Sequence, residues 1–437
     1  MKIAIVGAGI SGLVVAHRLH QHHDVTVFEA NDYIGGHTNT FDVPTPTGSL
    51  PVDTGFIVFN DWTYPNFIEL LDELKVQSQP AEMSFSVRTQ AGLEYNGHSL
   101  NTLFAQRRNL LNLRFHRMVR DIVRFNRQAR DLLSTLDEEM TIEQFLVQNN
   151  YGNEFRDWYL LPIGAAIWSC PLGQFASFPI RFIVEFYHNH GLLNINNRPQ
   201  WRVISGGSRE YVKKLTAGFQ DRIKTSTPVN KVVRQQDQVS VHFENGQQDF
   251  DHVVFACHAD QALRILGPDA SSTEQERLSE FPYSRNVATL HTDASVLPRS
   301  RRAWASWNYR LPEDQEAPVS VTYNMNILQS LQTKETYCVT LNAEPGQIDA
   351  SKTIQSFVYD HPIFTTKRAS VQRRHDELIN VNRTSYCGAY WRNGFHEDGV
   401  VSAMAVCEAI QNSPHATVQP GGDSVQSEAL TSKGACP

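Results

Sequence analysis

The chain has 437 residues, of which 41% are hydrophobic and 19% charged, and its formal net charge is −7. This length exceeds what one simple core accommodates, so two domains are expected. The acidic balance argues against a general nucleic-acid binder, and no apolar run is long enough to cross a membrane. The six cysteines have no CxxC or metal-ligand spacing, which is typical of reduced thiols in a cytoplasmic protein.

The first thirteen residues predict a dinucleotide-binding turn. Residues 2–6 form a predicted buried strand, GAGISG follows as a glycine turn, and residues 12–21 form a predicted helix. Gly7 permits the tight turn, Gly9 lets the backbone approach a pyrophosphate, and Gly12 allows close packing of helix on strand. The unpaired N–H groups and the positive dipole end of the helix favour phosphate binding.

An acidic residue stands where the ribose of such a cofactor is bound. A second predicted strand, residues 25–28, ends in Glu29, about twenty residues after the turn. A carboxylate at this place accepts hydrogen bonds from both ribose hydroxyls and disfavours a phosphorylated ribose. FAD or NAD is therefore expected rather than NADP.

Two further glycine sites follow. Gly35 and Gly36 come just after the ribose-binding acid, where they let the backbone lie flat against the diphosphate and the flavin end of the cofactor. Gly55, which precedes Phe56, again allows a close approach of the backbone to a planar ring.

From about residue 100 to residue 195 the pattern becomes helical, and Thr141 and Gln144 predict a capping box. Arginines crowd a predicted helix in this region, against one neighbouring acid, Asp121. They are Arg107, Arg108, Arg114, Arg117, Arg120, Arg124, Arg127 and Arg130. The face formed by Arg117, Arg120, Arg124 and Arg127 lies beside an apolar stripe of Leu111, Phe115, Met118, Ile122 and Phe125. A solvated helix packed on the core is the favoured interpretation, and contact of the 107–130 segment with the inner membrane surface is the alternative.

Strands return after residue 225. Residues 231–234, 239–243 and 253–256 are predicted strands, with Asn245 and Gly246 as a hairpin turn. Further strands are predicted between residues 285 and 345, including 320–323 and 337–341. The block from Tyr386 to Ala403 reads as strand, glycine-rich loop and a final helix over 399–411. The start of this helix could stabilise negative charge on the N1–C2=O edge of a reduced flavin. Residues 412–437, rich in Ser, Gly, Pro and Gln, are expected to be a disordered tail.

These motifs, in this order, resemble the flavin-containing amine oxidase and phytoene-desaturase superfamily of FAD enzymes. The resemblance rests on the first turn, Glu29, the Gly35–Gly36 pair, Ser205-Gly-Gly-Ser208, Val229 before a strand, and the terminal block. Six short segments are similar to those of a bacterial subgroup of NAD/FAD-binding, amine-oxidase-like proteins. They are GGHTNT, DTGFIVFN, AAIWSCP, WASWNYR, TYNMN and GFHEDG. Genes of that subgroup often neighbour cyclopropane-fatty-acid-synthase-like methyltransferases. The likeness extends to about residue 411.

The resemblance implies an α/β fold in which a Rossmann-like FAD-binding domain is interleaved with an α+β substrate domain. Segments 1–75, 200–265 and 380–411 would form the first domain, and segments 76–199 and 266–379 the second. FAD would be bound noncovalently. Its expected contacts are Gly7, Gly9, Ile10, Ser11, Gly12, Glu29, Ala30, Gly35, Gly36, His37, Thr38, Gly55, Phe56, Val229, Glu397, Asp398, Gly399 and Val400.

Several residues depart from the superfamily pattern. His37 stands where the superfamily usually has Arg, and Phe395 and His396 stand where amine oxidases place a cage tyrosine. The chain has no convincing counterpart of the lysine that holds a water at flavin N5. It also lacks the sequence context for covalent flavin attachment, so Cys387 is expected to be a packed thiol. These departures leave FAD binding intact and weaken the amine-oxidation interpretation.

Candidates for proton transfer and metal binding are few. His396 lies in the loop expected to face the flavin and is the first choice for a proton acceptor, with a structural role as the equal alternative. Glu397 and Asp398 are expected to bind the ribityl chain or to cap the final helix. His188 and His190 have HxH spacing without an identifiable third ligand, so no metal site is predicted.

The expected reaction is dehydrogenation or desaturation of an apolar, lipid-linked fatty acyl substrate by hydride transfer to flavin N5. Apolar and aromatic clusters at residues 163–168 and 304–309 could line a tunnel for such a chain or form ordinary core. A flavin amine oxidase is the first alternative. A noncatalytic FAD-binding partner of a lipid-modifying enzyme is the second, and a lipid methyltransferase is the partner to expect.

Overall fold

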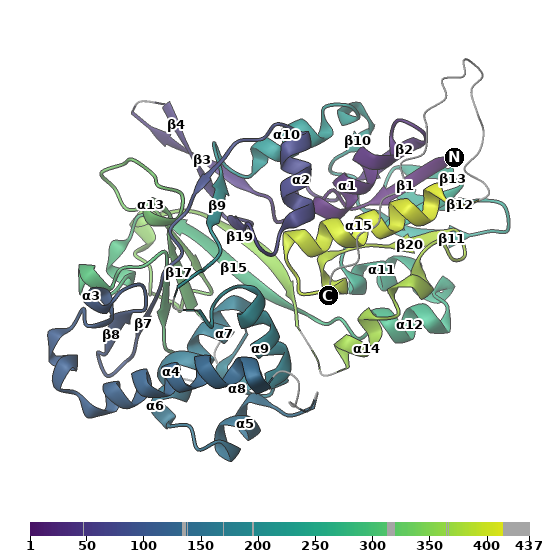
Figure 1. Cartoon of the computed structure of the whole chain (residues 1–437). Helices are drawn as coiled ribbons and strands as arrows, with labels where there is room; N and C mark the ends of the chain where they lie inside the picture. Colours follow the sequence, from purple (N-terminus) through teal and green to yellow (C-terminus); the bar gives the residue numbers. More distant parts are fainter. Residues whose placement is uncertain are drawn as a thin grey trace, which may run out of the picture.

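The computed structural model describes residues 1–413 apart from 47, 133–136, 138, 169, 195, 313–319, 364 and 366. The side chains of Arg130 and Leu132, and the expected tail beyond Ser413, lie outside the described residues. In Figure 1 the N-terminal strands and the last helix lie on the right, and the helices of residues 113–189 lie at the lower left. No helix of the described part is both long and apolar enough to span a membrane.

A parallel sheet of five strands lies at the centre of the first domain. Its order is β10 (Ile223–Lys224), β2 (Asp24–Phe28), β1 (Lys2–Val6), β14 (His252–Phe255) and β20 (Thr384–Tyr386). Every neighbouring pair is parallel. Ile3, Ala4 and Ile5 are completely buried, because layers cover both faces of the sheet. This is the Rossmann-like arrangement that the first motif predicts.

Alternate residues of these strands face two different layers. On one face lie α1 (Ile10–Leu19), α2 (Pro65–Glu73), α10 (Arg209–Thr216) and α15 (His396–Gln411). On the other face lie α11 (Ala259–Leu266), α12 (Ser272–Leu278), α14 (Arg368–Gln372) and an antiparallel sheet of β11 (Val229–Arg234), β12 (Val239–Phe243) and β13 (Gly246–Phe250). Phe243 pairs with Gly246, which confirms the predicted hairpin turn.

The second domain contains a sheet of seven strands. Its order is β19 (Thr353–Pro362), β15 (Tyr283–His291), β18 (Cys338–Leu341), β17 (Ser320–Asn324), β16 (Trp307–Arg310), β7 (Phe85–Arg88) and β8 (Glu94–Asn96). All pairs are antiparallel except β16 with β7. Its helices are α3 (Leu100–Leu103), α4 (Leu113–Leu132), α5 (Ile142–Gln148), α6 (Asn153–Phe155), α7 (Leu161–Trp168), α8 (Leu172–Ala176), α9 (Ile180–Asn189) and α13 (Met325–Leu328). The expected mixed fold of a Rossmann-like and an α+β domain is therefore confirmed.

Small sheets lie between the two large ones. A hairpin joins β3 (Thr40–Thr45) to β4 (Gly48–Asp53), and β9 (Trp201–Ile204) pairs with both β5 (Val58–Asn60) and β6 (Ser78–Pro80). Two segments expected in the substrate domain pack instead with the parallel sheet. Leu278, Phe281 and Leu378 share a core with Phe28 and Phe255, so residues 266–281 and 368–379 extend the first domain.

The arginine-rich helix packs on the core through its apolar stripe, as favoured from the sequence. Phe115, Met118 and Phe125 of α4 are completely buried in the core of the second domain. Leu111 was expected in this stripe and is instead 89% exposed, because it belongs to the 3-10 turn η1 (Arg107–Leu111), which ends before α4 begins. Helical spacing therefore does not apply to it.

The starts of three other helices can be compared with the prediction. Thr141 and Gln144 form the predicted capping box at the start of α5. The final helix begins at His396 rather than at Gly399, because the Asp398 carboxylate accepts a hydrogen bond from the Phe395 backbone N–H and so caps the helix three residues earlier. Likewise α1 begins at Ile10, two residues before the predicted start.

Candidate flavin site

The first glycine turn leaves an open surface at the start of α1. Gly7 has φ +109°, and a Cβ on it would lie 2.9 Å from the Ala256 carbonyl oxygen. A Cβ on Gly12 would lie 2.0 Å from the Gly7 carbonyl oxygen. A Cβ on Gly9, by contrast, would meet no atom within 4 Å. The fold itself therefore requires Gly7 and Gly12, whereas Gly9 keeps space open beside the backbone.

The N-terminus of α1 faces this space without a side-chain cap. Gly9 is the N-cap residue, and the first turn of α1 carries no acidic side chain. The second glycine pair lies against the turn: Gly35 donates its N–H to the Ala8 carbonyl oxygen at 2.9 Å, and a Cβ on Gly36 would lie 3.1 Å from the Cα of Gly9. The helix start therefore presents unpaired backbone N–H groups and a positive dipole end in a cradle of glycines, which suits a diphosphate.

Glu29 is buried at the carboxyl end of β2. Its Oε2 accepts a hydrogen bond from the Ala8 N–H at 2.8 Å, and its Oε1 accepts two from Asn31, both at 2.9 Å. These contacts fix the carboxylate beside the glycine turn. A carboxylate has about four lone-pair sites, so acceptor capacity remains for ribose hydroxyls.

The chain before β11 runs beside the residues that follow Glu29. Thr227 donates its backbone N–H to the Glu29 carbonyl oxygen, and Ser226 donates to the Asn31 carbonyl oxygen, each at 2.8 Å. Val229 then begins β11 as a buried residue, whereas Ala30 is exposed. The structure therefore brings Val229 to the same end of the cradle as Glu29, the acid expected to bind ribose.

The starts of α1 and α15 meet. Ser11 donates its hydroxyl to the Gly399 carbonyl oxygen at 3.0 Å, and a Cβ on Gly399 would lie 2.8 Å from a methyl carbon of Ile10. Val400 is buried in the same core as α1. Two helix N-termini thus converge on one region, although 388 residues separate Ser11 from Gly399. Figure 1 shows the two helices side by side.

A family model described as "flavin containing amine oxidoreductase" matches residues 10–300, two thirds of the chain. The chain belongs to this family. Its cofactor is FAD. The glycine cradle, the carboxylate of Glu29 and the paired helix starts fit the diphosphate, ribose and flavin edge of that cofactor. When bound, FAD supplies a hydride acceptor.

Curated relatives match a short part of the chain. A probable flavin-containing monooxygenase 1 from Arabidopsis thaliana is 42% identical over 82 residues, which are 17% of this chain and 15% of the plant protein. The 4,4'-diapophytoene desaturase (4,4'-diaponeurosporene-forming) of Staphylococcus aureus strain Newman is 41% identical over 80 residues, 16% of each protein. The chain thus matches less than a fifth of the length of either relative.

Solved structures match nearly the whole chain. Putrescine oxidase bound to putrescine has a TM-score of 0.66 at 16% identity and covers 94% of this chain and 99% of its own. Cyclohexylamine oxidase from Brevibacterium oxydans has a TM-score of 0.66 at 15% identity, with the same coverage. A CLA-producing fatty acid isomerase from P. acnes has a TM-score of 0.64 at 15% identity and covers 94% of this chain and 97% of its own. At such identities these similarities establish the fold.

Within the FAD-binding domain, Glu397 and Asp398 both cap helices. Glu397 was expected to bind the ribityl chain or to cap its own helix, but its carboxylate accepts hydrogen bonds from the Asn66 side chain at 2.6 Å and the Phe67 backbone N–H at 2.8 Å. It therefore caps α2. Asp398 accepts hydrogen bonds from the backbone N–H groups of Asn393 and Phe395 and so caps α15. Capping of this helix was one of the two roles expected for it. Burial raises the pKa of Asp398 to about 6.

His396 is enclosed within the FAD-binding domain. Its Nε2 lies 2.9 Å from the Thr38 hydroxyl and 3.2 Å from the Tyr211 hydroxyl, and its ring stacks on Phe56 at 3.5 Å. Burial lowers its pKa to about 3, so the ring stays neutral. Two roles were considered for His396, a proton acceptor and a structural residue, and these contacts favour the structural role. Tyr211 is a site residue that sequence reasoning missed.

Sequence reasoning also missed an aromatic group around His37. The ring of His37 lies 5.1 Å from Tyr359, 5.5 Å from His361 and 6.2 Å from His258. The Phe56 N–H donates to the His37 carbonyl oxygen at 2.7 Å, which ties the Gly55 turn to the second glycine pair. Burial lowers the pKa of His361 to about 4 and holds the pKa of His37 well below its usual value. His258 follows the carboxyl end of β14, and ligands of parallel sheets bind at this edge. That position is the signal by which the sequence could have indicated His258 as a site residue.

Asp53 joins the two domains and was not singled out from the sequence. Its Oδ1 accepts hydrogen bonds from the Thr40 hydroxyl at 2.6 Å and from the Ser208 N–H and hydroxyl, both at 2.8 Å. Its Oδ2 accepts from the Gln329 side chain at 2.9 Å. Burial raises the pKa of Asp53 to about 6 against these lowering hydrogen bonds. The DTGF and SGGS motifs therefore meet at one buried carboxylate.

Cys387, His188 and His190 were also singled out from the sequence. Cys387 is completely buried and its thiol pKa is raised well above its usual value by burial, so it is the packed thiol that was expected. His188 is exposed, while His190 is buried against Phe186. Within the described ranges, no group of three or more His, Cys, Asp or Glu side chains could hold a metal ion.

On the substrate side, an aromatic wall begins at Phe395, directly before α15. Phe395 stacks with Phe186 at 5.4 Å and lies 5.7 Å from His190, and Phe186 contacts Trp168 at 4.8 Å. Among the buried polar atoms of the described second domain that have no hydrogen-bond partner in the chain are Nε1 of Trp168 and the hydroxyls of Tyr187 and Tyr309. Since buried polar groups are normally paired, such atoms are candidates for contact with a bound molecule.

Proposed function

We propose that this protein is an FAD-dependent oxidoreductase that dehydrogenates or desaturates an apolar, lipid-linked fatty acyl chain. The observation that carries the proposal is the aromatic wall from Phe395 through Phe186 to Trp168, which continues from the helix start expected at the flavin. An apolar wall suits alignment of a C–H bond with a hydride acceptor, because it excludes water and holds an acyl chain by contact area.

Charge near this wall disfavours an amine substrate. The guanidinium of Arg368 lies over the Phe182 ring at 4.1 Å, and Phe182 contacts Trp168 at 5.3 Å. Arg368 is buried and also donates to the Asn393 side chain. A buried cation beside the wall raises the cost of placing an ammonium group there, and the Asp398 carboxylate at Phe395 offsets part of that cost. Together with Phe395 and His396 in place of a cage tyrosine, this makes a flavin amine oxidase the second candidate.

The names of the similar proteins include both candidate substrate classes, long apolar molecules and amines. The fatty acid isomerase and the diapophytoene desaturase are named for long apolar molecules, and the putrescine and cyclohexylamine oxidases for amines. The resemblance to a subgroup whose genes neighbour lipid methyltransferases adds to the first candidate. A lipid methyltransferase remains the proposed partner.

Anaerobic mixing of the FAD-loaded protein with substrates tests the proposal. Phospholipids with unsaturated or methylated acyl chains should bleach the flavin absorbance, and putrescine or cyclohexylamine should not. Bleaching by the amines alone would replace the proposal with the second candidate. If no compound in either class bleaches the flavin, the oxidoreductase proposal fails in favour of a noncatalytic FAD-binding protein.

A pair of tyrosine variants tests whether the wall binds the substrate. Tyr187→Phe removes a hydroxyl without a partner, so the free energy of unfolding should change by less than about 0.5 kcal/mol while flavin reduction slows. In the matched variant Tyr95→Phe, the lost hydroxyl donates to the Trp158 carbonyl oxygen at 2.5 Å. That variant should lose about 1 kcal/mol of stability and keep the rate of flavin reduction. Equal rates in both variants would remove Tyr187 from the substrate site.

A further inference from the structure

The second domain exposes leucines that belong to none of the hydrophobic clusters of the described chain. Leu100 begins α3, Leu110 and Leu111 end η1, and Leu113 begins α4. Their side chains are 77%, 51%, 89% and 80% exposed, respectively. Every leucine of the described residues that is half or more exposed belongs to this stretch. Single exposed apolar residues are ordinary, but a concentration of them marks an interaction surface.

The local fold holds these leucines in place. The Arg107 guanidinium donates to the carbonyl oxygens of Asn101 and Phe104 at 3.3 and 2.9 Å, so η1 folds back onto α3. Asn112 accepts a hydrogen bond from the Arg114 N–H at 3.1 Å and sets the start of α4. The exposed leucines are therefore presented by fixed turns.

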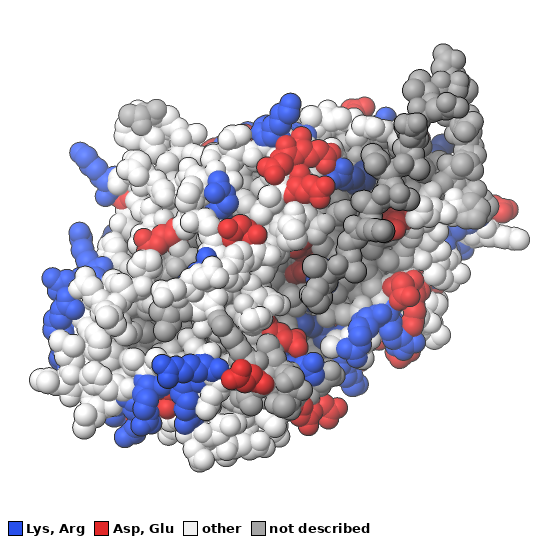
Figure 2. Space-filling model, viewed as in Figure 1, with Lys and Arg blue, Asp and Glu red and all other residues white. Residues whose placement is uncertain are grey.

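A basic face continues from the leucines along α4. Leu113 lies four, seven and fourteen positions before Arg117, Arg120 and Arg127, on one side of the helix. Local acids neutralise this face only in part. Glu154 accepts from Arg114 at 2.7 Å and lies 3.6 Å from Arg117, and Asp121 lies 3.5 Å from Arg120. The side chains of Arg117 and Arg120 nevertheless stay 53% and 72% exposed, and Arg127 is exposed as well. In Figure 2, Lys and Arg side chains gather at the lower left, over the position of α4 in Figure 1.

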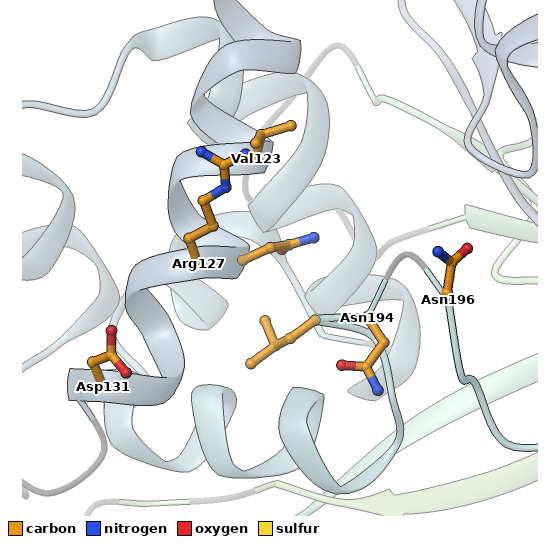
Figure 3. Close-up of a pocket in the computed structure, with 7 residues that line it drawn as sticks. Val123, Arg127, Asp131, Asn194 and Asn196 are labelled. Atoms are coloured by element: carbon orange, nitrogen blue, oxygen red, sulfur yellow. The ribbon is translucent and has the colours of Figure 1, made fainter.

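Two shallow depressions lie along the same helix. One, of about 520 Å³, is lined by Val119, Val123, Arg120, Arg124, Arg127 and Gln128. The other, of about 460 Å³, lies between α4 and the chain after α9. Figure 3 shows Val123 and Arg127 on α4, with Asn194 and Asn196 on the facing segment. The depression of about 520 Å³, which combines two valines with three arginines, suits a phosphate head group whose glycerol and first methylenes contact valine, whereas Asp131 and asparagines line the other.

We propose that this α3–α4 surface, formed by Leu100, Leu110, Leu111, Leu113, Arg117, Arg120 and Arg127, docks on an anionic lipid bilayer. The leucines enter the boundary between head groups and acyl chains, and the arginines bind lipid phosphates. Exposed apolar side chains lie beside a face of positive charge in a protein that is acidic overall, a combination that suits an anionic bilayer. The docking proposal does not depend on the reaction proposed above, although docking would give that reaction access to membrane acyl chains.

Co-sedimentation of the FAD-loaded protein with vesicles tests this proposal. Binding should be strong to vesicles containing phosphatidylglycerol, weak to vesicles of phosphatidylcholine alone, and reduced by high salt. Arg117→Gln, Arg120→Gln and Arg127→Gln together should lower the partition coefficient about a hundredfold, since each basic residue contributes about 1 kcal/mol, a factor of about five, at such a surface. Arg124 is left unchanged because it stacks on Tyr151 at 3.8 Å and donates to the Asn149 carbonyl oxygen.

Two further variants separate the apolar from the basic contribution. Leu110→Ser, Leu111→Ser and Leu113→Ser together should lower binding at least tenfold, also at high salt, where the arginine contribution is screened. The control variant removes the same number of positive charges outside the docking surface. It combines Arg264→Gln, Arg285→Gln and Arg373→Gln, at three exposed positions. It should bind like the parent.

Flavin content and thermal unfolding confirm that each variant is folded. Equal binding by parent, leucine and arginine variants would overturn the proposal. So would leucine-dependent self-association without vesicles, because the surface would then be an interface between two copies. Neither result bears on turnover of dispersed substrate, so failure of the docking proposal and failure of the proposed reaction are distinguishable.

Discussion

At the scale of single residues, the three glycines of the first turn are required for different reasons. Gly7 and Gly12 are fixed by the protein, because a Cβ on either would approach backbone atoms at 2.9 or 2.0 Å. Gly9 has an ordinary φ of −75° and an open surface. We propose that the absence of a side chain there serves the cofactor, and this difference can be measured.

Gly9→Ala should leave the flavin-free protein intact and weaken FAD binding. The free energy of unfolding without FAD should change by less than about 0.5 to 1 kcal/mol, while the Kd for FAD should rise at least about tenfold, because the methyl group occupies the space at the helix start. Gly12→Ala should instead lower the stability of the flavin-free protein by about 2 kcal/mol or more. Fluorescence titration and urea unfolding measure both quantities. A Gly9→Ala protein with the parental Kd would place the diphosphate elsewhere.

At the scale of elements, helix starts organise the site. α1 leaves its N-terminus open, α15 meets it through Ser11 and Gly399, and α2 is capped by Glu397 of α15. One carboxylate therefore locks α2 to the helix that bears the terminal motif. The motif residues GFHEDG thus serve the assembly of the site as well as any contact with FAD.

Loss of this cap should cost stability. Glu397→Ala removes the acceptor of the Asn66 and Phe67 N–H groups and the negative charge at the start of α2, so the flavin-free protein should lose about 1–3 kcal/mol of unfolding free energy. Glu408→Ala, an exposed position of the same helix, should cost less than about 0.5 kcal/mol. If Glu397→Ala left stability unchanged and lowered only the affinity for FAD, Glu397 would be a cofactor ligand.

The sequence predicts what depends on neighbours along the chain. The strand, glycine turn and helix of residues 2–19, the acid after β2 and the capping box of α5 are local patterns, and each folds as its spacing indicates. Asp53 with Gln329 and Thr38 with His396 are separated by 276 and 358 residues, so their contacts depend on long-range packing, between the two domains for the first pair and within the FAD-binding domain for the second. Leu111 was misplaced because helical periodicity was extended through a 3-10 turn.

At the scale of the whole molecule, buried histidines make the fold sensitive to acid. Burial lowers the pKa values of four completely or nearly buried histidines: His190, His252 and His291 to about 4, and His396 to about 3. Each of these lowered pKa values means that the folded state favours the neutral imidazole ring. Their stabilising effect is therefore present above the unfolded pKa of about 6.5 and is lost as pH falls below it.

Two buried aspartates act in the opposite direction. Burial raises the pKa of Asp53 and Asp398 to about 6, so their cost to the folded state decreases as pH falls from 6 towards 4. Each of the six groups contributes on the order of 1 kcal/mol between pH 7.5 and 5.5, and the four histidines outweigh the two aspartates. We expect the free energy of unfolding of the flavin-free protein to be lower at pH 5.5 than at pH 7.5, as measured by urea unfolding. Equal or greater stability at pH 5.5 would mean that these rings are hydrated and titrate normally.

The central claim is that FAD is held noncovalently where the N-termini of α1 and α15 meet. The most direct measurement is the flavin content of the purified protein before and after acid precipitation. The account predicts a yellow protein with close to one FAD per chain, whose flavin appears entirely in the acid supernatant and rebinds to the refolded chain. A folded protein without flavin that does not take up added FAD would contradict the claim.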